Sequence, residues 1–143
     1  MGPHVLLIDE ATAVLDPFIR NRFMLEIDQR NKKTGMTTII ATNIGTEIAV
    51  LKGRLLIMQK GSLVVDRAAE NISDGFAKIR VSSSEADKTI AAGFSFLEQN
   101  LDGSISFLGK EEGLSKLNFA YQGDKRSISV DEIFIFYSDR KAI

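Results

Sequence analysis

The sequence has no cysteine and no tryptophan, and among its 143 residues it has only one histidine and two prolines. A chain without cysteine forms no disulfide and no thiolate metal site, which fits a reducing compartment. Its 18 basic and 19 acidic side chains nearly balance, and the net charge of -1 provides no overall attraction to nucleic acid or to an anionic membrane. We therefore expect no nucleic-acid partner, and any charged ligand must be recognised by a local group of side chains.

Long apolar runs are also missing. The sequence shows neither a secretory signal nor an apolar segment long enough to cross a membrane. Hydrophobic residues nevertheless make up 44% of the chain, which is enough to bury the core of one compact domain or of two small ones. We expect a soluble chain that contacts a membrane only through a partner.

A short apolar run, residues 5–8, ends at two adjacent carboxylates, Asp9 and Glu10. Such a run is typical of a strand in a parallel sheet that is covered on both faces. In open α/β sheets ligands bind at the carboxyl ends of the strands, so the two carboxylates would lie where chemistry takes place. The plain alternative is the polar end of a strand. The dipeptide alone favours that alternative, because acidic residues are common in loops.

The next segment has the pattern of a helix. Asp16 can accept hydrogen bonds from the amides of a first turn, and the proline that follows suits the first helical position. Apolar residues recur at every fourth position from Ile19 to Ile27, which predicts one apolar face. Two lysines and a glycine follow soon after residue 31, where we expect the helix to end.

The β-branched residues 37–40 predict a second strand, so strand, helix and strand follow one another as in a parallel βαβ unit. A short helix at residues 46–51 comes next. Residues 54–58 and 62–65 alternate in character on either side of a Lys-Gly pair, which indicates a hairpin.

The second half begins after a polar stretch, residues 68–75, and has a different composition. We interpret it as a packing and interaction module without a concentration of catalytic side chains. The patterns predict a half-exposed strand (76–81), a helix that starts at 82–86, a hairpin around the turn at 100–103, a short helix (110–117), a strand (118–121) and a helix (129–137). We expect the phenylalanines to form its core: Phe94, Phe96, Phe107, Phe119, Phe134 and Phe136.

Residues 5–66 resemble the second half of an ATP-binding cassette (ABC) ATPase domain. The resemblance rests on four motifs in the family's order: VLLIDE as the Walker B strand, ATAVLD as the D-loop, TTIIAT before the switch position, and LLIMQKGSLV as the closing hairpin. The end of the chain, SVDEIFIFY, is similar to the SLEDVFL helix of accessory domains in exporter ATPases. The resemblance implies an α/β fold with two parts. Residues 1–67 would be a partial P-loop NTPase-like parallel sheet, and residues 68–143 a small α/β accessory domain.

The resemblance also implies roles for four residues. Asp9 would hold magnesium through its hydration shell, and Glu10 would polarise the water that attacks the γ-phosphate of ATP. Asp16 would occupy the D-loop position, which crosses the interface of an ATPase dimer and couples its two nucleotide sites. Asn43 stands at the switch position, where the family usually has histidine. Since an amide donates a hydrogen bond but carries no charge, we expect Asn43 to weaken hydrolysis.

Two family motifs are missing from the sequence: the phosphate-binding loop GxxxxGK[ST] and a signature of the LSGGQ type. Both precede the Walker B strand in the family, so we expect this chain to begin midway through the domain and to be inactive alone. ATP and magnesium would act in the complete protein. The expected partners are a membrane permease and a second ATPase domain or second copy, on the cytoplasmic face of the membrane. The alternative is a non-catalytic interaction or regulatory protein built on an ATPase remnant.

Overall fold

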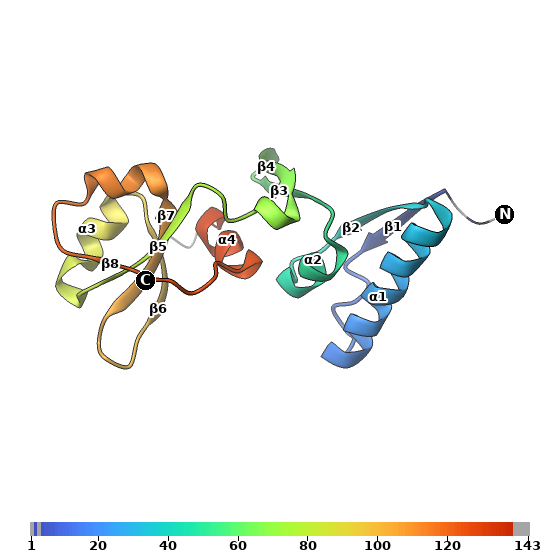
Figure 1. Cartoon of the computed structure of the whole chain (residues 1–143), viewed down its shortest axis with the longest axis horizontal. Helices are drawn as coiled ribbons and strands as arrows, with labels where there is room; N and C mark the ends of the chain where they lie inside the picture. The colour runs from blue at the N-terminus through green and yellow to red at the C-terminus, as the bar shows by residue number, and fades with distance from the viewer. Residues whose placement is uncertain (1, 3, 139–143) are drawn as a thin grey trace.

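The computed structural model describes residues 2 and 4–138 and shows a mixed α/β protein with three small sheets. Figure 1 shows β1, β2, α1 and α2 at one end of an elongated molecule, the four-stranded sheet at the other end, and the hairpin β3–β4 with α4 between them. No helix among these residues is long and apolar enough to span a membrane. In chain order the elements are β1 (Val5–Asp9), α1 (Pro17–Thr34), β2 (Thr37–Ala41), α2 (Gly45–Leu51), β3 (Arg54–Gln59), β4 (Ser62–Ala68), η1 (Ala69–Asn71), β5 (Phe76–Val81), η2 (Ser83–Glu85), α3 (Ala86–Ala91), β6 (Ser95–Gln99), β7 (Ile105–Lys110), η3 (Glu111–Lys116), β8 (Gln122–Gly123) and α4 (Val130–Tyr137).

The predicted strand–helix–strand unit is present, and β1 and β2 pair in parallel. Asp16 caps α1, because its side chain accepts hydrogen bonds from the amides of Phe18 and Ile19, each 3.0 Å long. The helix ends three residues later than predicted, at Thr34. Gly35 then adopts a left-handed conformation, and its amide donates to the carbonyl of Asn31.

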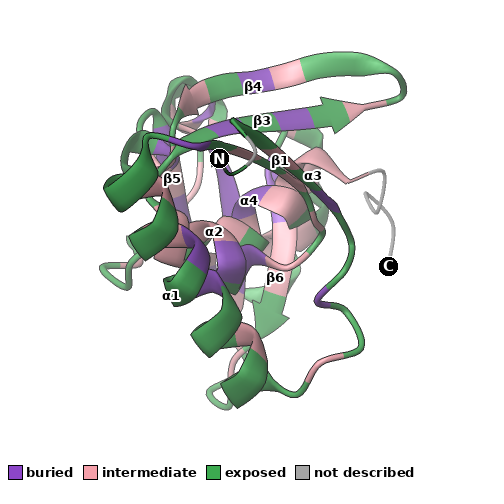
Figure 2. Cartoon of the chain, turned by 90° about the vertical axis from the view of Figure 1, so that its right-hand side faces the viewer, coloured by how far each residue is buried: buried purple, intermediate pink, exposed green. Residues whose placement is uncertain are grey.

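The expectation that β1 is covered on both faces was wrong. Ile8 is 8% exposed and packs against buried Met24 and Ile27 of α1, whereas Leu7 is 71% exposed. Side chains alternate along a strand, and α1 covers only one face of the two-stranded sheet. In Figure 2 most of α1 is exposed, and its buried turns lie next to α2.

The apolar face predicted for α1 is also only partly buried. Ile27 is in the core, but Ile19 and Phe23 remain 43% and 38% exposed. Met24, one position from the predicted face, is almost fully buried instead. The helix therefore presents a line of apolar side chains to solvent within the described structure.

The hairpin β3–β4 has the predicted turn, with positive φ at Lys60 and Gly61. One face of the hairpin packs against the second half of the chain. Leu55, Ile57 and Val65 share a hydrophobic cluster with Ile72, Phe76, Leu108 and Ile133. This core therefore extends across the division at residue 67, and that division stays a prediction.

The second half is a four-stranded antiparallel sheet in the order β6-β7-β5-β8. β5 has the predicted bounds, but it is mostly buried rather than half-exposed, because Phe76 belongs to the cluster shared with the hairpin and Ile79 and Val81 belong to the other cluster. Two of the six phenylalanines, Phe94 and Phe107, are the buried centre of one cluster, on which Phe96 and Phe119 pack. The other two, Phe134 and Phe136, pack on the cluster that includes the hairpin.

The strand predicted at residues 118–121 was wrong. The short strand β8 lies at Gln122–Gly123, where it pairs with Ile79 and Arg80 of β5. A strand forms where the chain has a partner in register, and residues 122 and 123 are the ones that pair with β5. The helix predicted at residues 110–117 is the 3₁₀ helix η3. The helix predicted at residues 129–137 was confirmed as α4.

Candidate functional site

The carboxyl ends of β1 and β2 form one edge of the parallel sheet. The register places Asp9 opposite Ala41, and the amide of Glu10 donates to the Ala41 carbonyl at 2.9 Å. Asn43 is the second residue after the end of β2. The side chains of Asp9, Glu10 and Asn43 are all exposed. The pairing of the two strands therefore brings three of the four predicted site residues to the same edge.

Glu10 is where the chain leaves the strand direction. Its φ is +46°, in the left-handed region that residues other than glycine rarely adopt. The following residues form a turn, in which the amide of Ala13 donates to the Glu10 carbonyl at 3.2 Å. A left-handed non-glycine residue costs on the order of 1–3 kcal/mol and is concentrated at functional sites. The alternation of side chains between the two faces of the strand thus ends at Glu10. The sequence pattern did not reveal this change of backbone conformation.

The two carboxylates at this edge are of the type that magnesium binds. The described residues contain no group of three or more histidine, cysteine, aspartate or glutamate side chains that would hold a metal ion. Asp9 and Glu10 supply two adjacent exposed carboxylates. Magnesium commonly keeps several waters and binds one or two carboxylates together with phosphate oxygens, so two carboxylates suffice for it.

Asp16 lies apart from this edge, at the start of α1. Its Oδ1 atom accepts both capping hydrogen bonds, and the side chain is exposed. The capping role predicted for it is confirmed. Its role at the D-loop position stays a prediction.

Sequence reasoning missed a buried polar cluster behind the edge. Glu47 of α2 is 2% exposed, and its Oε1 atom accepts a hydrogen bond from the hydroxyl of Thr12, which is equally buried. Arg20 of α1 donates from Nε to the Thr12 carbonyl at 3.2 Å and lies 3.7 Å from Glu47 Oε1. Among the described residues Glu47 Oε2 has no hydrogen-bond partner. The only sequence signal was a single acidic residue within the apolar surroundings of α2.

Comparison with known proteins finds relatives that are ATP-binding proteins of transporters, although the sequence matches no family model. An energy-coupling factor transporter ATP-binding protein, EcfA1, of Clostridium perfringens is 30% identical over 117 residues, or 82% of this chain. The related EcfA2 of Clostridium tetani is 39% identical over 66 residues, covering 46% of this chain and 23% of the relative. The spermidine/putrescine import ATP-binding protein PotA of Mycoplasma genitalium is 36% identical over 62 residues, covering 43% of this chain and 11% of the relative.

The chain is a homologue of ABC transporter ATP-binding proteins. The resemblance read from the four sequence motifs is thereby confirmed. This ABC homologue spans about two fifths, 41%, of the length of the Clostridium perfringens relative.

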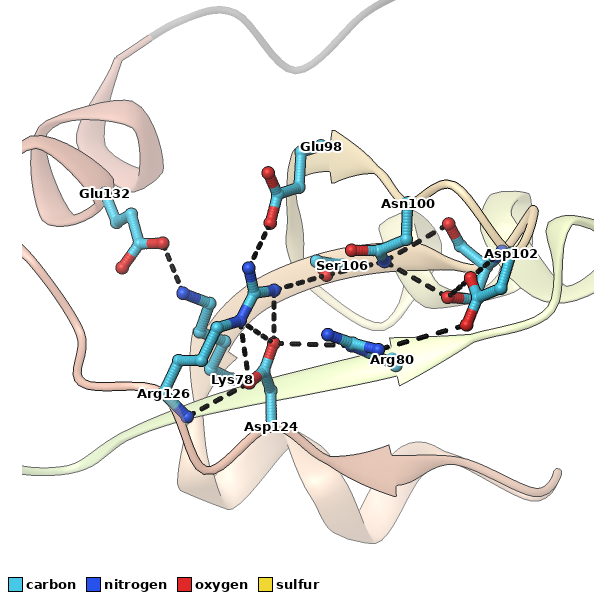
Figure 3. A network of polar contacts seen from close by, with 10 residues as sticks. Lys78, Arg80, Glu98, Asn100, Asp102, Ser106, Asp124, Arg126 and Glu132 are labelled. Atoms are coloured by element: carbon cyan, nitrogen blue, oxygen red, sulfur yellow. Dashed lines mark hydrogen bonds and ion pairs between the residues drawn. The ribbon is translucent and has the colours of Figure 1, made fainter.

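The second half of the ABC homologue contains a larger polar network on its sheet, shown in Figure 3. Arg126 is at its centre. The guanidinium donates to Asp124 at 2.6 Å, forms an ion pair with Glu98 at 2.7 Å, and donates to the Ser106 hydroxyl at 3.2 Å. Hydrogen bonds from Arg126 lower the pKa of the Asp124 carboxyl well below its usual range, and hydrogen bonds to Asp124 and Glu98 raise the pKa of Arg126.

The other cations of this network also have carboxylate partners. Arg80 lies 3.6 Å from Asp124 and 3.9 Å from Asp102, and the buried ammonium of Lys78 donates to Glu132 at the start of α4. Each positive charge in Figure 3 therefore has an opposite charge within reach. Such a compensated network fixes strands and helix to one another.

Proposed function

We propose that this chain is the carboxyl-terminal part of an ABC transporter ATP-binding subunit, which in its complete form couples ATP hydrolysis to transport. The observation that carries the proposal is the parallel register of β1 and β2, in which Asp9 pairs with Ala41. This register puts the end of VLLIDE beside the end of TTIIATN, as a P-loop NTPase-like sheet requires. Homology to EcfA1 along 82% of the chain supports the same function.

The three residues at the edge would divide the chemistry between them. Asp9 would hold magnesium through its hydration shell, and Glu10 would orient and polarise the attacking water. Asn43 would donate a hydrogen bond to the terminal phosphate. When bound, magnesium supplies positive charge that neutralises the phosphate oxygens. Because an amide neither carries charge nor relays a proton, Asn43 supports slower hydrolysis than histidine at this position.

Partners complete the proposed working unit. Asp16, at the amino end of α1, would lie at the interface with a second ATPase domain, provided by another subunit or another copy, and couple the two nucleotide sites. A membrane permease would hold the pair on the cytoplasmic face. The relatives, an energy-coupling factor transporter ATP-binding protein and a spermidine/putrescine import ATP-binding protein, support a transport role and leave the substrate of this chain open.

Nucleotide binding by this chain alone is expected to be weak. The 143 residues contain neither GxxxxGK[ST] nor an LSGGQ-like signature. A phosphate loop provides backbone amides and a lysine for the phosphates, and two exposed carboxylates do not replace them. We infer that the chain neither binds ATP tightly nor hydrolyses it without those motifs.

Isothermal calorimetry with magnesium-ATP tests this inference directly. The chain is titrated beside its Asp9→Ala and Glu10→Gln variants, and we expect no heat of binding in any of the three. Binding to the unaltered chain that Asp9→Ala abolishes would overturn the inference, since the chain would then assemble a nucleotide site by itself or with another copy.

A chimera tests the function itself. The segment 4–66 replaces its counterpart in the Clostridium perfringens EcfA1, which then contributes the preceding part of the domain. We expect ATP hydrolysis by the chimera, a loss of about 10²-fold or more with Glu10→Gln, and a gain with Asn43→His. A chimera that folds and binds ATP but whose hydrolysis is unaffected by Glu10→Gln would contradict the proposed role of that residue.

The second candidate, a non-catalytic interaction or regulatory protein, is favoured by Asn43 at the switch position and by the two missing motifs. Its distinguishing observation is the genomic neighbourhood. An adjacent reading frame that encodes GxxxxGK[ST] and an LSGGQ-like stretch would support the ATPase. Calorimetry without binding, together with a chimera that is inactive with either Asn43 or histidine, would support the second candidate.

A further inference from the structure

The short helix α2 receives its amino-terminal cap from a distant part of the chain. Its N-cap residue, Ile44, makes no side-chain capping bond. Instead the amide of Gly45 donates to Oδ1 of Asp131 at 3.1 Å, across 86 residues of sequence. Asp131 belongs to the first turn of α4. A carboxylate of the second half thus satisfies a free amide at the start of the helix that follows Asn43.

Glycine is needed for this approach. A Cβ atom added at Gly45 would lie 2.4 Å from Oδ1 of Asp131 and 2.7 Å from its Cγ, closer than real contacts of this kind. Gly45 is itself buried. Its lack of a side chain lets the α4 carboxylate reach the α2 backbone directly.

Asp131 is held in place by contacts within the second half of the chain. The capping box of α4 joins the Ser129 hydroxyl to the Glu132 amide at 3.1 Å, and the Glu132 carboxylate also accepts from Lys78 of β5. Two residues further along the helix, Ile133 is fully buried in the core shared with the hairpin. The positive ends of two helices, α2 and α4, therefore meet at one carboxylate whose backbone is fixed to the sheet of the second half.

The switch segment, residues 42–45, is fixed on both sides of Asn43. The amide of Ile44 donates to the Thr42 hydroxyl at 3.0 Å, and Gly45 donates to Asp131. Asn43 lies exposed between these bonds. Any displacement of α4 relative to α2 must break the bond to Gly45 or carry the segment with it.

We propose that Asp131 is a positioning residue for Asn43, through which the carboxyl-terminal half of the chain sets the conformation of the switch segment. The functional meaning of that control rests on the proposed function, in which Asn43 faces the terminal phosphate. The geometric part does not depend on nucleotide chemistry. α4 is thus the element by which the second half acts on the nucleotide edge.

The test measures amide hydrogen exchange and NMR shifts on the whole chain, with Asp131→Ala and Asp131→Asn. For Asp131→Ala we expect exchange at Gly45 to rise about fivefold, the factor that corresponds to about 1 kcal/mol for a lost helix cap. The side-chain amide signals of Asn43 should shift with it. Asp131→Asn keeps an acceptor oxygen and the shape of the side chain, and it should restore most of both effects. Asp131→Leu fills a similar volume but has no acceptor, and it should behave like Asp131→Ala, whereas a merely packing role would be preserved in it.

Asp87→Ala is the matched control, because Asp87 is an exposed aspartate in the first turn of α3. It should leave Gly45 and Asn43 unchanged. The amide of Ile133, which donates to the Ser129 carbonyl, reports whether α4 is intact in each variant. Unchanged Gly45 and Asn43 signals in Asp131→Ala, with α4 intact, would overturn the proposal.

If Asp131→Ala disrupts α4, the Asp131→Asn variant decides the question. Amide exchange at Gly45 as slow as in the unaltered chain supports the proposal. Amide exchange at Gly45 as fast as in an unfolded chain contradicts it. The hydrogen-exchange and NMR measurements are made without ATP. If Glu10→Gln does not change ATP hydrolysis by the chimera, that result counts against the proposed function. It leaves the role of Asp131 in positioning the switch segment unaffected.

Discussion

The hydroxyl of Thr12 donates a hydrogen bond to the buried carboxylate of Glu47, 35 residues away. Thr12 lies in the turn after Glu10, and Glu47 lies in the helix after Asn43, so the bond joins the segments that follow β1 and β2 at the carboxyl edge of the sheet. Arg20 of α1 donates a hydrogen bond to the Thr12 carbonyl and lies close to the Glu47 carboxylate, so α1 is connected to the same pair. The loops of the proposed site are therefore positioned by a buried polar cluster as well as by strand pairing.

Thr12→Val tests that cluster. Valine keeps the shape of threonine but removes the donor, and Glu47 then has a second oxygen without a close hydrogen-bond donor in a buried place. We expect the free energy of unfolding to fall by about 1–3 kcal/mol, measured by urea denaturation. Thr46→Val, at an exposed position of α2, is the control and should change stability by less than about 0.5 kcal/mol. Equal effects of the two substitutions would show that the bond contributes nothing.

Asp16→Ala removes the cap of α1. Two amides in the first turn, those of Phe18 and Ile19, lose their acceptor. We expect a loss of about 1 kcal/mol in the free energy of unfolding, with a decrease in helical circular dichroism near the transition. Glu26→Ala, an exposed substitution in the middle of α1, should have little effect. The prediction is wrong if Asp16→Asn, which retains a capping oxygen, is as destabilised as Asp16→Ala.

Local signals in the sequence predicted the elements that depend on local bonds. The Asp16 cap, the Lys60-Gly61 turn and the Ser129–Glu132 capping box each involve residues a few positions apart, and α1, the hairpin and α4 formed where expected. The parallel pairing of β1 and β2 followed from the order strand, helix, strand in the same way.

Features that depend on distant partners were not predictable. Leu7 has the same apolar character as Ile8, and only the one-sided packing of α1 decides which of them is exposed. Likewise, nothing near Gly45 or Glu47 in the sequence indicates that their partners are Asp131 and Thr12. Periodicity reports a face but not what covers it, and a residue type reports a donor but not its acceptor.

The ion pair of Asp124 and Arg126 gives stability a dependence on pH. The pKa of Asp124 is lowered in the folded protein, chiefly by hydrogen bonds from Arg126, so folding favours the ionised carboxylate. Its contribution is fully present above the unfolded value, roughly pH 4, and is lost as pH falls toward the lower folded pKa. We expect Asp124→Asn to be destabilised at pH 7 and the difference from the unaltered chain to shrink below about pH 4.

The Arg126→Ala background is the control for that measurement. Without the guanidinium the principal cause of the lowered pKa is gone, and the effect of Asp124→Asn should depend much less on pH. Denaturation at several pH values supplies all four free energies. An unchanged pH dependence in the Arg126→Ala background would show that another group holds the carboxylate ionised.

Gly109 of β7 permits the close approach of an aromatic ring. A Cβ atom at this position would lie 2.4 Å from Cδ1 of Phe94, whose side chain is buried in the core of the second half. Gly109→Ala should therefore lower the free energy of unfolding by about 1–3 kcal/mol through overpacking. In the double variant with Phe94→Leu the added methyl gains room, so the extra cost of alanine should fall. Additive costs would contradict the contact.

Apolar side chains on the open face of β1 and β2 should cause self-association. Leu7 and Ile39 pair in the register and are both more than half exposed, with Val5 on the same face. We expect sedimentation velocity to show association that grows with protein concentration and decreases in the Leu7→Lys, Ile39→Lys double variant. Leu101→Lys removes a fully exposed leucine from the β6–β7 turn without altering that face, and it should leave association unchanged. Equal loss of association in both variants would assign the effect to general charge, whereas a loss confined to the double variant assigns it to the open face of β1 and β2.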